Sequence, residues 1–230
     1  RDQKFQAEVN AAVEKALDGI PEANQGEALM ALGDLGQPSA EARLVQVLAS
    51  DKSTDRNRIY AAAGLAGFKG DAARAALEGA LETGVPRLQE TAAVTLGRYL
   101  PASAPKLVAR AIAEMTPAPV RLAIARALVH AKDPHAPAVL GLLLAIPIGP
   151  IRAAAAEGLG ALDVKYAVPA LLPLLVDAEI APSVARALGG LGDSRAIQPL
   201  IGAIGAGAPA ERALAVFWAL GDLKAVAAVP

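Results

Sequence analysis

Apolar residues along the chain recur with a period close to thirty residues. Each repeat opens at an apolar position, called the anchor here, and the residue three places later is apolar in every copy. Successive anchors are 33, 31, 32, 31, 29 and 29 residues apart. The seven anchors are Leu32, Leu65, Leu96, Leu128, Leu159, Leu188 and Phe217. A period of this length is typical of proteins built from stacked structural repeats.

The apolar residues of each repeat follow the spacing of two helices. Before the anchor they stand four residues apart, as in Ile124 and Leu128. After it they return eight, twelve and sixteen positions later, which places them on one face of a second helix. The first of these positions is alanine in every copy: Ala40, Ala73, Ala104, Ala136, Ala167, Ala196 and Ala225. Because a small side chain lets two helices approach closely, each repeat is predicted to be a tight helical hairpin.

Turn residues stand between the two helices of several repeats. Glycine is found four residues after the anchor, where helices commonly end in a left-handed residue, in three copies: Gly36, Gly192 and Gly221. Aspartate follows five residues after the anchor in three copies: Asp133, Asp193 and Asp222. A carboxylate there can accept hydrogen bonds from the first amides of the second helix. These residues predict where the first helix ends and the second begins.

The repeats resemble HEAT repeats, and in particular the short type found in phycobilisome lyases. The resemblance rests on segments such as PIRAAAAEGLGAL from Pro150 and LGGLGDSRAIQPLIGAI from Leu188. The family's arginine, seven residues before the anchor, is matched by Arg58, Arg121 and Arg152, whereas other copies have Gln25, Gln89, Ala181 and Ala210. The resemblance implies an all-α fold, a right-handed α-solenoid of about seven HEAT-like helical hairpins.

Two regions are expected along the chain. Residues 1–20 contain one amphipathic helix, which is predicted to cap the N-terminal end of the repeats. Residues 21–230 are predicted to form the repeats as one elongated domain. Only eight residues follow Asp222, so the last repeat is predicted to be incomplete. Its open apolar edge is expected to be covered by a partner, by a second copy of the chain or by further residues.

Composition excludes several classes of function. The net charge is −1, whereas a protein that binds nucleic acid usually carries a basic stripe. Cysteine is absent, which excludes disulfides, thiol catalysis and cysteine-ligated metals. The chain begins with Arg1 instead of methionine, which fits removal of a signal peptide and fits a shortened chain equally well. The sequence therefore does not indicate a compartment.

Residues able to carry catalysis are sparse. His130 and His135 are five residues apart with Asp133 between them, which resembles a metal site only loosely. His135 also falls where other repeats have Arg195 or Lys224, an exposed position. No glycine-rich phosphate loop and no serine–histidine arrangement is recognisable. No enzymatic activity, cofactor or metal is predicted.

The charge of the chain falls sharply after Asp133. Residues 1–133 hold 32 of the 45 charged side chains, and residues 139–151 hold none. This uncharged segment is interrupted by Pro147, Gly149 and Pro150 and is shorter than the roughly 20 apolar residues of a membrane-spanning helix. A membrane span is therefore not predicted.

The second helices of repeats four to six are apolar at positions where a free solenoid usually carries charge. The resemblance implies that second helices line a concave surface, so an uncharged stripe there predicts a partner-binding groove. Trp218 is added as an aromatic residue close to the open C-terminal end. The expected contact residues are Leu142, Leu143, Leu172, Leu174, Ile201 and Trp218. The alternative, that these side chains pack between repeats, stays open.

Three functions are compatible with these features. The first is a non-enzymatic interaction scaffold or accessory subunit that binds a protein through the uncharged stripe or the open C-terminal end, with self-association as one form of such binding. The second is a tetrapyrrole-handling role like that of a bilin lyase, which only the family resemblance implies. The third is nucleic-acid binding of the kind seen in HEAT-like DNA glycosylases, which the near-neutral charge disfavours.

Overall fold

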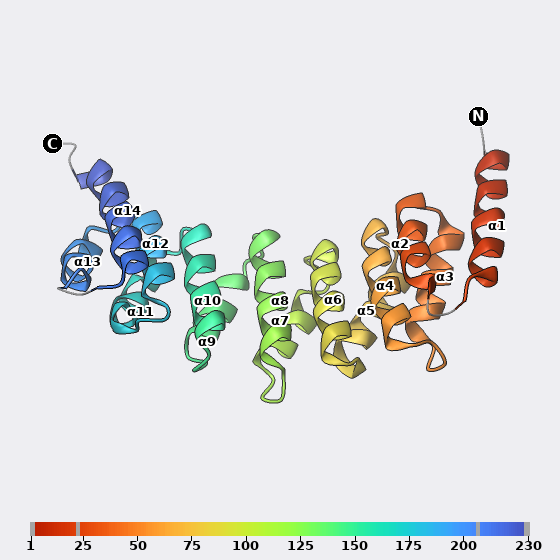
Figure 1. The fold of residues 1–230 in the computed structure, drawn as a ribbon, viewed down its shortest axis with the longest axis horizontal. Coiled ribbons are helices and arrows are strands. Elements are labelled where there is room, and N and C mark those ends of the chain that lie inside the picture. Colours follow the sequence, from red (N-terminus) through yellow and green to blue (C-terminus); the bar gives the residue numbers. More distant parts are fainter. Residues whose placement is uncertain (1–2, 22–23, 206–207, 228–230) are drawn as a thin grey trace. The chain divides into compact units, whose positions relative to one another are not determined.

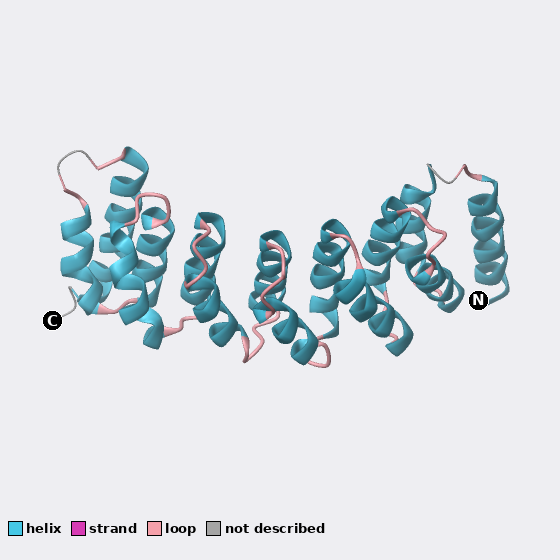
Figure 2. Ribbon diagram, turned by 90° about the horizontal axis from the view of Figure 1, so that it is seen from below, coloured by secondary structure: helices cyan, strands magenta, loops and turns pink. Residues whose placement is uncertain are grey.

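The computed structural model describes residues 3–21, 24–205 and 208–227. Helices and loops make up this part of the chain, which contains no strand (Figure 2). The predicted all-α class is therefore confirmed. The chain divides into two compact units, Arg1–Ala127 and Leu128–Pro230, with the boundary inside α8 (Ala118–His130). No helix of the described residues is both long enough and apolar enough to cross a membrane.

The first unit alternates the first and second helices of successive repeats, after one preceding helix (Figure 1). The preceding helix is α1 (Gln3–Gly19), of which Leu17 is buried at 1% exposure. First helices are α2 (Gln25–Leu35), α4 (Asp55–Gly64), α6 (Pro86–Leu96) and the part of α8 up to Ala127. Second helices are α3 (Pro38–Ala49), α5 (Asp71–Thr83) and α7 (Ala104–Ile112). Consecutive first helices pack side by side, as do α3 and α5.

The second unit continues the same alternation. Its first helices, after the end of α8, are α10 (Gly149–Ala161), α12 (Ala181–Leu191) and α14 (Ala210–Ala227). Its second helices are α9 (Ala136–Leu144), α11 (Val168–Leu171) with the 3-10 helix η5 (Leu172–Val176), and α13 (Ile197–Ala203). The break between α11 and η5 coincides with Pro173, which has no amide hydrogen to donate to an α-helical bond. Helix α12 packs against α10 on one side and α14 on the other.

The core of each repeat is built by the anchor and by the alanine eight residues later. The first six anchors are only 0–1% exposed. The alanines from Ala40 to Ala196 are 0–6% exposed. The side chain of Ala225, the seventh of these alanines, lies outside the described part of the chain. Burial of both positions explains why the sequence pattern repeats them so strictly, since each residue fills the space inside a hairpin.

The seventh anchor differs from the other six. Phe217 is 58% exposed, so its assignment as an anchor is wrong. Leu220 takes this place, because Ala219 just before it packs against α12 and Gly221 follows it, as Gly189 follows Leu188. The last repeat is thus displaced by three residues, and its spacing from Leu188 is 32 residues, like that of earlier repeats.

The turns after the first helices follow the prediction in part. Gly36 and Gly192 end their helices with positive φ angles of 63° and 67°. Asp133 and Asp193 accept hydrogen bonds from the amides two residues later, at 2.9 Å each. Gly221 and Asp222 lie inside α14 instead, because the displaced register puts them within the helix. The prediction that they form a turn is therefore wrong.

The arginine position of the repeat secures the end of the preceding helix. Arg121 donates to the carbonyl oxygens of Ala111, Ala113, Glu114 and Thr116 at 2.8–2.9 Å, which satisfies carbonyl groups left unpaired where α7 ends. Gln25 and Gln89 occupy the same position and donate their amides to carbonyls at the ends of α1 and α5. Glutamine therefore keeps part of this contact, with two carbonyl acceptors for Gln25 and one for Gln89.

Candidate functional site

Within each unit, consecutive first helices contact each other through one recurring face. On α2 this face contains Gly26 and Gly33, which are seven residues apart. A Cβ atom on Gly26 would lie 2.4 Å from the ring of Tyr60, and one on Gly33 would lie 2.3 Å from the carbonyl oxygen of Gly64. Leu29 lies between them on the same face and is 0% exposed. We call the positions six before, three before and one after the anchor the stacking face.

The stacking face recurs in the second unit with the same close approach. A Cβ atom on Gly160 would lie 2.9 Å from the Cα atom of Ala187, and one on Gly189 would lie 2.6 Å from the Cα atom of Ala219. The middle position of the face is 0–2% exposed in all of the first six repeats: Leu29, Ala62, Ala93, Ala125, Ala156 and Ala185. Glycine at the third position of the face therefore lets α2 lie directly on α4, α10 on α12, and α12 on α14.

Helix α14 presents this face without any cover in the described structure. Leu214 and Phe217 hold its first two positions and are 59% and 58% exposed. Gly221 holds the third, and nothing lies within 4 Å of the place where its Cβ atom would be. Trp218 lies beside them and is 73% exposed. We call Leu214, Phe217, Trp218 and Gly221 the α14 face.

The opposite side of α14 packs against the rest of the unit and is also apolar. Val216, Ala219 and Leu223 are 0–2% exposed on that side, where α14 meets α12. Both sides of the helix are thus apolar, and only one of them is buried. A large exposed apolar surface of this kind marks a contact site in a folded protein.

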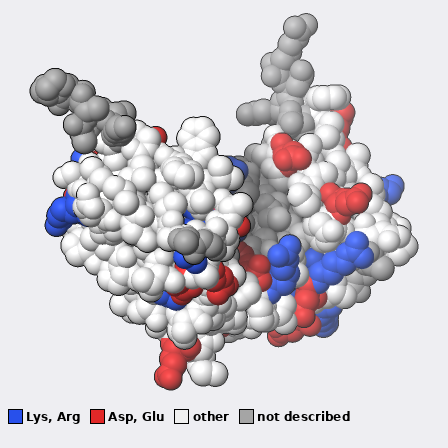
Figure 3. Space-filling view, turned by 60° about the vertical axis from the view of Figure 1, so that its left-hand side comes forward, with Lys and Arg blue, Asp and Glu red and all other residues white. Residues whose placement is uncertain are grey.

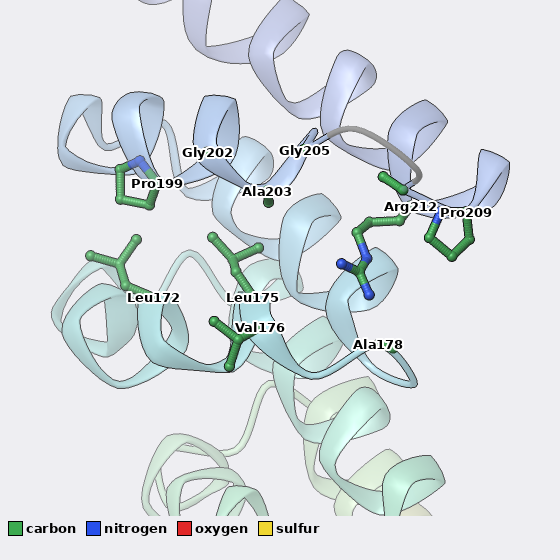
Figure 4. A pocket seen from close by; sticks show the side chains of 11 residues that line it. Leu172, Leu175, Val176, Ala178, Pro199, Gly202, Ala203, Gly205, Pro209 and Arg212 are labelled. Carbon is green, nitrogen blue, oxygen red and sulfur yellow. The ribbon is translucent and has the colours of Figure 1, made fainter.

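A groove lies next to the beginning of the same helix. It encloses about 720 Å³ between η5, α13 and the first turn of α14, and its apolar walls include Leu172, Val176 and Pro199 (Figure 4). Among the described residues lining it, Arg212 is the only charged one. Figure 4 shows its side chain reaching from α14 into the groove, on the side of Leu175 and Ala178. We call this the Arg212 groove.

The six residues expected to contact a partner are placed differently from one another. Leu142, Ile201 and Trp218 are 55%, 50% and 73% exposed. Leu172 and Leu174 are partly exposed, and Leu172 lines the Arg212 groove. The structure brings Leu172 together with Pro199 and Gly202 across this groove.

Leu143 cannot contribute to a binding surface. It is 1% exposed and packs in the core with Val139 and Leu140 on the inner side of α9. Neighbouring residues of a helix point about 100° apart, and on α9 Leu142 faces solvent at 55% exposure while Leu143 faces the core. The sequence prediction for Leu143 is therefore wrong.

The sequence prediction missed the other residues of the α14 face and Arg212. Leu214 and Gly221 were hidden by the displaced register of the last repeat. Two signals in the sequence could have revealed the correct register. One is the spacing of 32 residues from Leu188 to Leu220, which matches earlier repeats. The other is the glycine that directly follows the anchor in several repeats, namely Gly33, Gly97, Gly160, Gly189 and Gly221. Figure 3 shows that the C-terminal unit, nearest the viewer, carries few charged side chains over a largely uncharged surface.

Asp133 and His135 have a structural role at the start of α9. The carboxylate of Asp133 is buried, accepts the amide hydrogen of His135 and lies 2.8 Å from the Nδ1 atom of the same residue. These contacts fix the start of α9. Within residues 3–21, 24–205 and 208–227, no three histidine or acidic side chains converge in a way that could hold a metal ion.

In the sixth repeat, the capping residue is Asp193, and its carboxylate forms an ion pair with Arg195. Arg195 donates from Nε and Nη2 to both carboxylate oxygens of Asp193 at 2.7–3.1 Å. These hydrogen bonds, together with the one from the Arg195 amide, lower the pKa of Asp193 from 3.8 to about 2. In the first unit, burial raises the pKa of Tyr99 to about 12, and its hydroxyl donates to the carbonyl oxygen of Leu65 at 3.2 Å.

Comparisons with known proteins identify the repeats. The family profile described as HEAT repeats matches residues 136–221, and the profile described as PBS lyase HEAT-like repeat matches residues 25–50. No curated protein matches the sequence significantly.

Two solved structures are similar to this chain. Human deoxyhypusine hydroxylase in complex with glycerol is 19% identical, with 94% of this chain and 84% of that chain covered and a TM-score of 0.46. The complex of CpcE and CpcF of phycocyanin lyase from Nostoc sp. is also 19% identical, with 86% and 88% covered and a TM-score of 0.47.

The matched profiles lie on the residues that build the hairpins. The first covers α9 to α14 and contains the anchors Leu159 and Leu188, and the second covers α2 and α3 with the anchor Leu32. Residues 136–221 therefore match HEAT repeats, and residues 25–50 match a HEAT-like repeat of the phycobilisome-lyase type.

Proposed function

We propose that this protein is a non-enzymatic interaction scaffold that binds an α-helix of a partner protein on its α14 face. One observation carries the proposal. Phe217 holds the middle position of the stacking face and is 58% exposed, whereas the residues at this position in the other six repeats are 0–2% exposed. Among the described residues, α14 thus offers the face that the next first helix covers on α2, α10 and α12.

The size of the exposed side chains supports tight binding. Complete burial of a large apolar side chain stabilises a complex by roughly 1.5–3 kcal/mol. Leu214, Phe217 and Trp218 are each more than half exposed, so each has area left to bury. Aromatic residues at the centre of an interface commonly dominate its binding energy. These three side chains are therefore expected to anchor the partner.

The precedent within the chain favours a helix as the occupant. An α-helix covers each of the equivalent glycines Gly33, Gly160 and Gly189. That helix has a small residue at the point of contact, which is Gly64, Ala187 or Ala219. We therefore expect a partner helix that places alanine or glycine against Gly221. A second copy of the chain is the alternative occupant.

The remaining surface residues fit the scaffold as secondary contacts. Leu142 and Ile201 are about half exposed on the second helices of the C-terminal unit. A tetrapyrrole would bring two propionates, and Arg212 is the only basic residue among the described ones lining the 720 Å³ groove. The lining therefore supports a protein partner better than a tetrapyrrole.

Site-specific cross-linking in the native source tests the proposal. A photoreactive phenylalanine analogue replaces Phe217, and the matched control replaces Tyr166, which is 75% exposed in the same unit. We expect the probe at position 217 to attach to one helix of one protein, and the probe at 166 to give no such product. Attachment to α14 of a second copy would indicate self-association instead. Equal, scattered products from both positions would contradict the proposal.

A further inference from the structure

The Arg212 groove combines apolar walls with one cation, Arg212, which has no ion-pair partner among the described residues. Leu172, Val176 and Pro199 supply the walls, and no carboxylate is among the described residues that line the groove. Asp177, which directly follows η5, forms an ion pair with Arg152 at 2.7 Å. Glu211, beside Arg212 in sequence, is exposed and does not line the groove.

The guanidinium group of Arg212 has one hydrogen-bond donor without an acceptor among the described residues. The side chain is partly buried, and its Nε atom is shielded from solvent and has no hydrogen-bond acceptor in the part of the chain that the structure describes. A shielded donor without a partner is costly, and a carboxylate is the group that a guanidinium pairs with best. Arg212 therefore favours an acidic ligand group over a neutral one.

The beginning of α14 adds to the positive potential at the same place. Pro209 lines the groove and immediately precedes the helix, so the N-terminal end of α14 opens onto it. The first amides of a helix have no carbonyl partner within the helix, and the helix dipole makes this end positive. The helix end and the guanidinium thus favour the same kind of ligand group.

From this we infer that the Arg212 groove binds a peptide segment of a partner protein, with an acidic side chain on Arg212 and apolar neighbours on Leu172, Val176 and Pro199. The groove is open to solvent, which suits a segment of polypeptide whose backbone stays partly hydrated. The inference rests on the proposed scaffold function, but it concerns a different surface from the α14 face. Each of the two can therefore fail without the other.

A titration with defined peptides tests the inference. The probe is an acetylated and amidated pentapeptide with a central glutamate between two pairs of leucines, and the control peptide has glutamine at the centre. The full chain is used, and the Nε–H resonance of Arg212 is followed by NMR. We expect a saturable shift with the glutamate peptide and an affinity about fivefold higher, or more, than with the glutamine peptide.

Two variants separate charge from packing. Arg212→Gln removes the charge and is expected to abolish the preference for glutamate, whereas Arg212→Lys is expected to retain most of it. Unchanged amide resonances of α12 show that each variant is folded. Gly221→Ala, which alters the α14 face, is expected to leave the peptide affinity unchanged.

Three results would overturn the inference. The first is no saturable shift with the glutamate peptide, and the second is equal affinity for the two peptides. The third is tighter binding of octanoate than of the glutamate peptide, because this would assign the groove to a small amphiphilic acid. None of these results touches Phe217 or Gly221, so the proposed function would be judged separately by cross-linking.

Discussion

Gly189 lies directly against Ala219, so close that a Cβ atom on Gly189 would be 2.6 Å from the Cα atom of Ala219. Gly221 holds the equivalent position one repeat later and has nothing within 4 Å in the described structure. The two glycines therefore form a matched pair. They have the same role in the repeat, and only one of them is covered.

The pair predicts opposite effects of the same substitution. Gly189→Ala forces α12 and α14 apart and is expected to destabilise the protein by about 1–3 kcal/mol. Gly221→Ala meets no neighbour and is expected to be neutral or to stabilise α14 by up to about 1 kcal/mol, because alanine favours helix more than glycine does. Urea denaturation of both variants measures the difference. Similar destabilisation by both would mean that Gly221 is covered within the chain.

The α14 face can be altered without harm to the fold. Phe217→Glu changes an exposed side chain, so the free energy of unfolding is expected to change by no more than about 0.5 kcal/mol. Binding of the cross-linked partner is expected to be lost, since the change places a charge in an apolar interface. The control is Leu188→Ala, a buried anchor, which is expected to cost about 2–5 kcal/mol. Full partner binding by Phe217→Glu would argue against the α14 face.

Arg121 is expected to matter more than its partly exposed position suggests. Its guanidinium group serves four carbonyl oxygens around the end of α7. Arg121→Met removes these donors and is expected to destabilise the first unit by roughly 1–3 kcal/mol. Hydrogen exchange of the α7 amides should become faster, whereas exchange in α12 should not change. Equal protection of α7 in both proteins would show that water replaces the guanidinium at no cost.

The low pKa of Asp193 predicts a defined dependence on acid. The native carboxylate, with a pKa of about 2 against 3.8 ordinarily, contributes stability that is present above pH 3.8 and lost as the pH falls toward 2. Arg195→Met removes the side-chain donors and is expected to raise this pKa, though not fully, because the amide of residue 195 still donates. NMR titration of the carboxyl carbon measures it. A pKa unchanged by the substitution would exclude the Arg195 side chain as its cause.

Much of the fold could be predicted because the repeat pattern is local. Anchors such as Leu65 and Leu159 and the alanines eight residues later are buried for reasons that each hairpin contains in its own sequence. The turns at Gly36 and Gly192 follow from the same local pattern. The prediction failed at the last repeat, where Phe217 and Leu220 are both apolar and three residues apart, so two registers fit.

The candidate site was harder to predict because it depends on neighbours. Leu142 and Leu143 are equally apolar, and only the packing of α9 decides that Leu143 is buried. Arg212 becomes notable only when η5, α13 and α14 converge around it. Trp218 was predicted as a contact residue, and its 73% exposure leaves it available, but partner binding there stays a prediction.

The sole tryptophan of the chain offers the most direct measurement of the central claim, that the α14 face is open for a partner. Fluorescence of Trp218 is recorded with acrylamide as a quencher, first for the purified dilute protein and then with the cross-linked partner added. The account predicts the emission and quenching of a water-exposed indole for the protein alone, and blue-shifted, protected emission in the complex. Blue-shifted and protected emission from the dilute protein alone would contradict it, because the face would then already be covered.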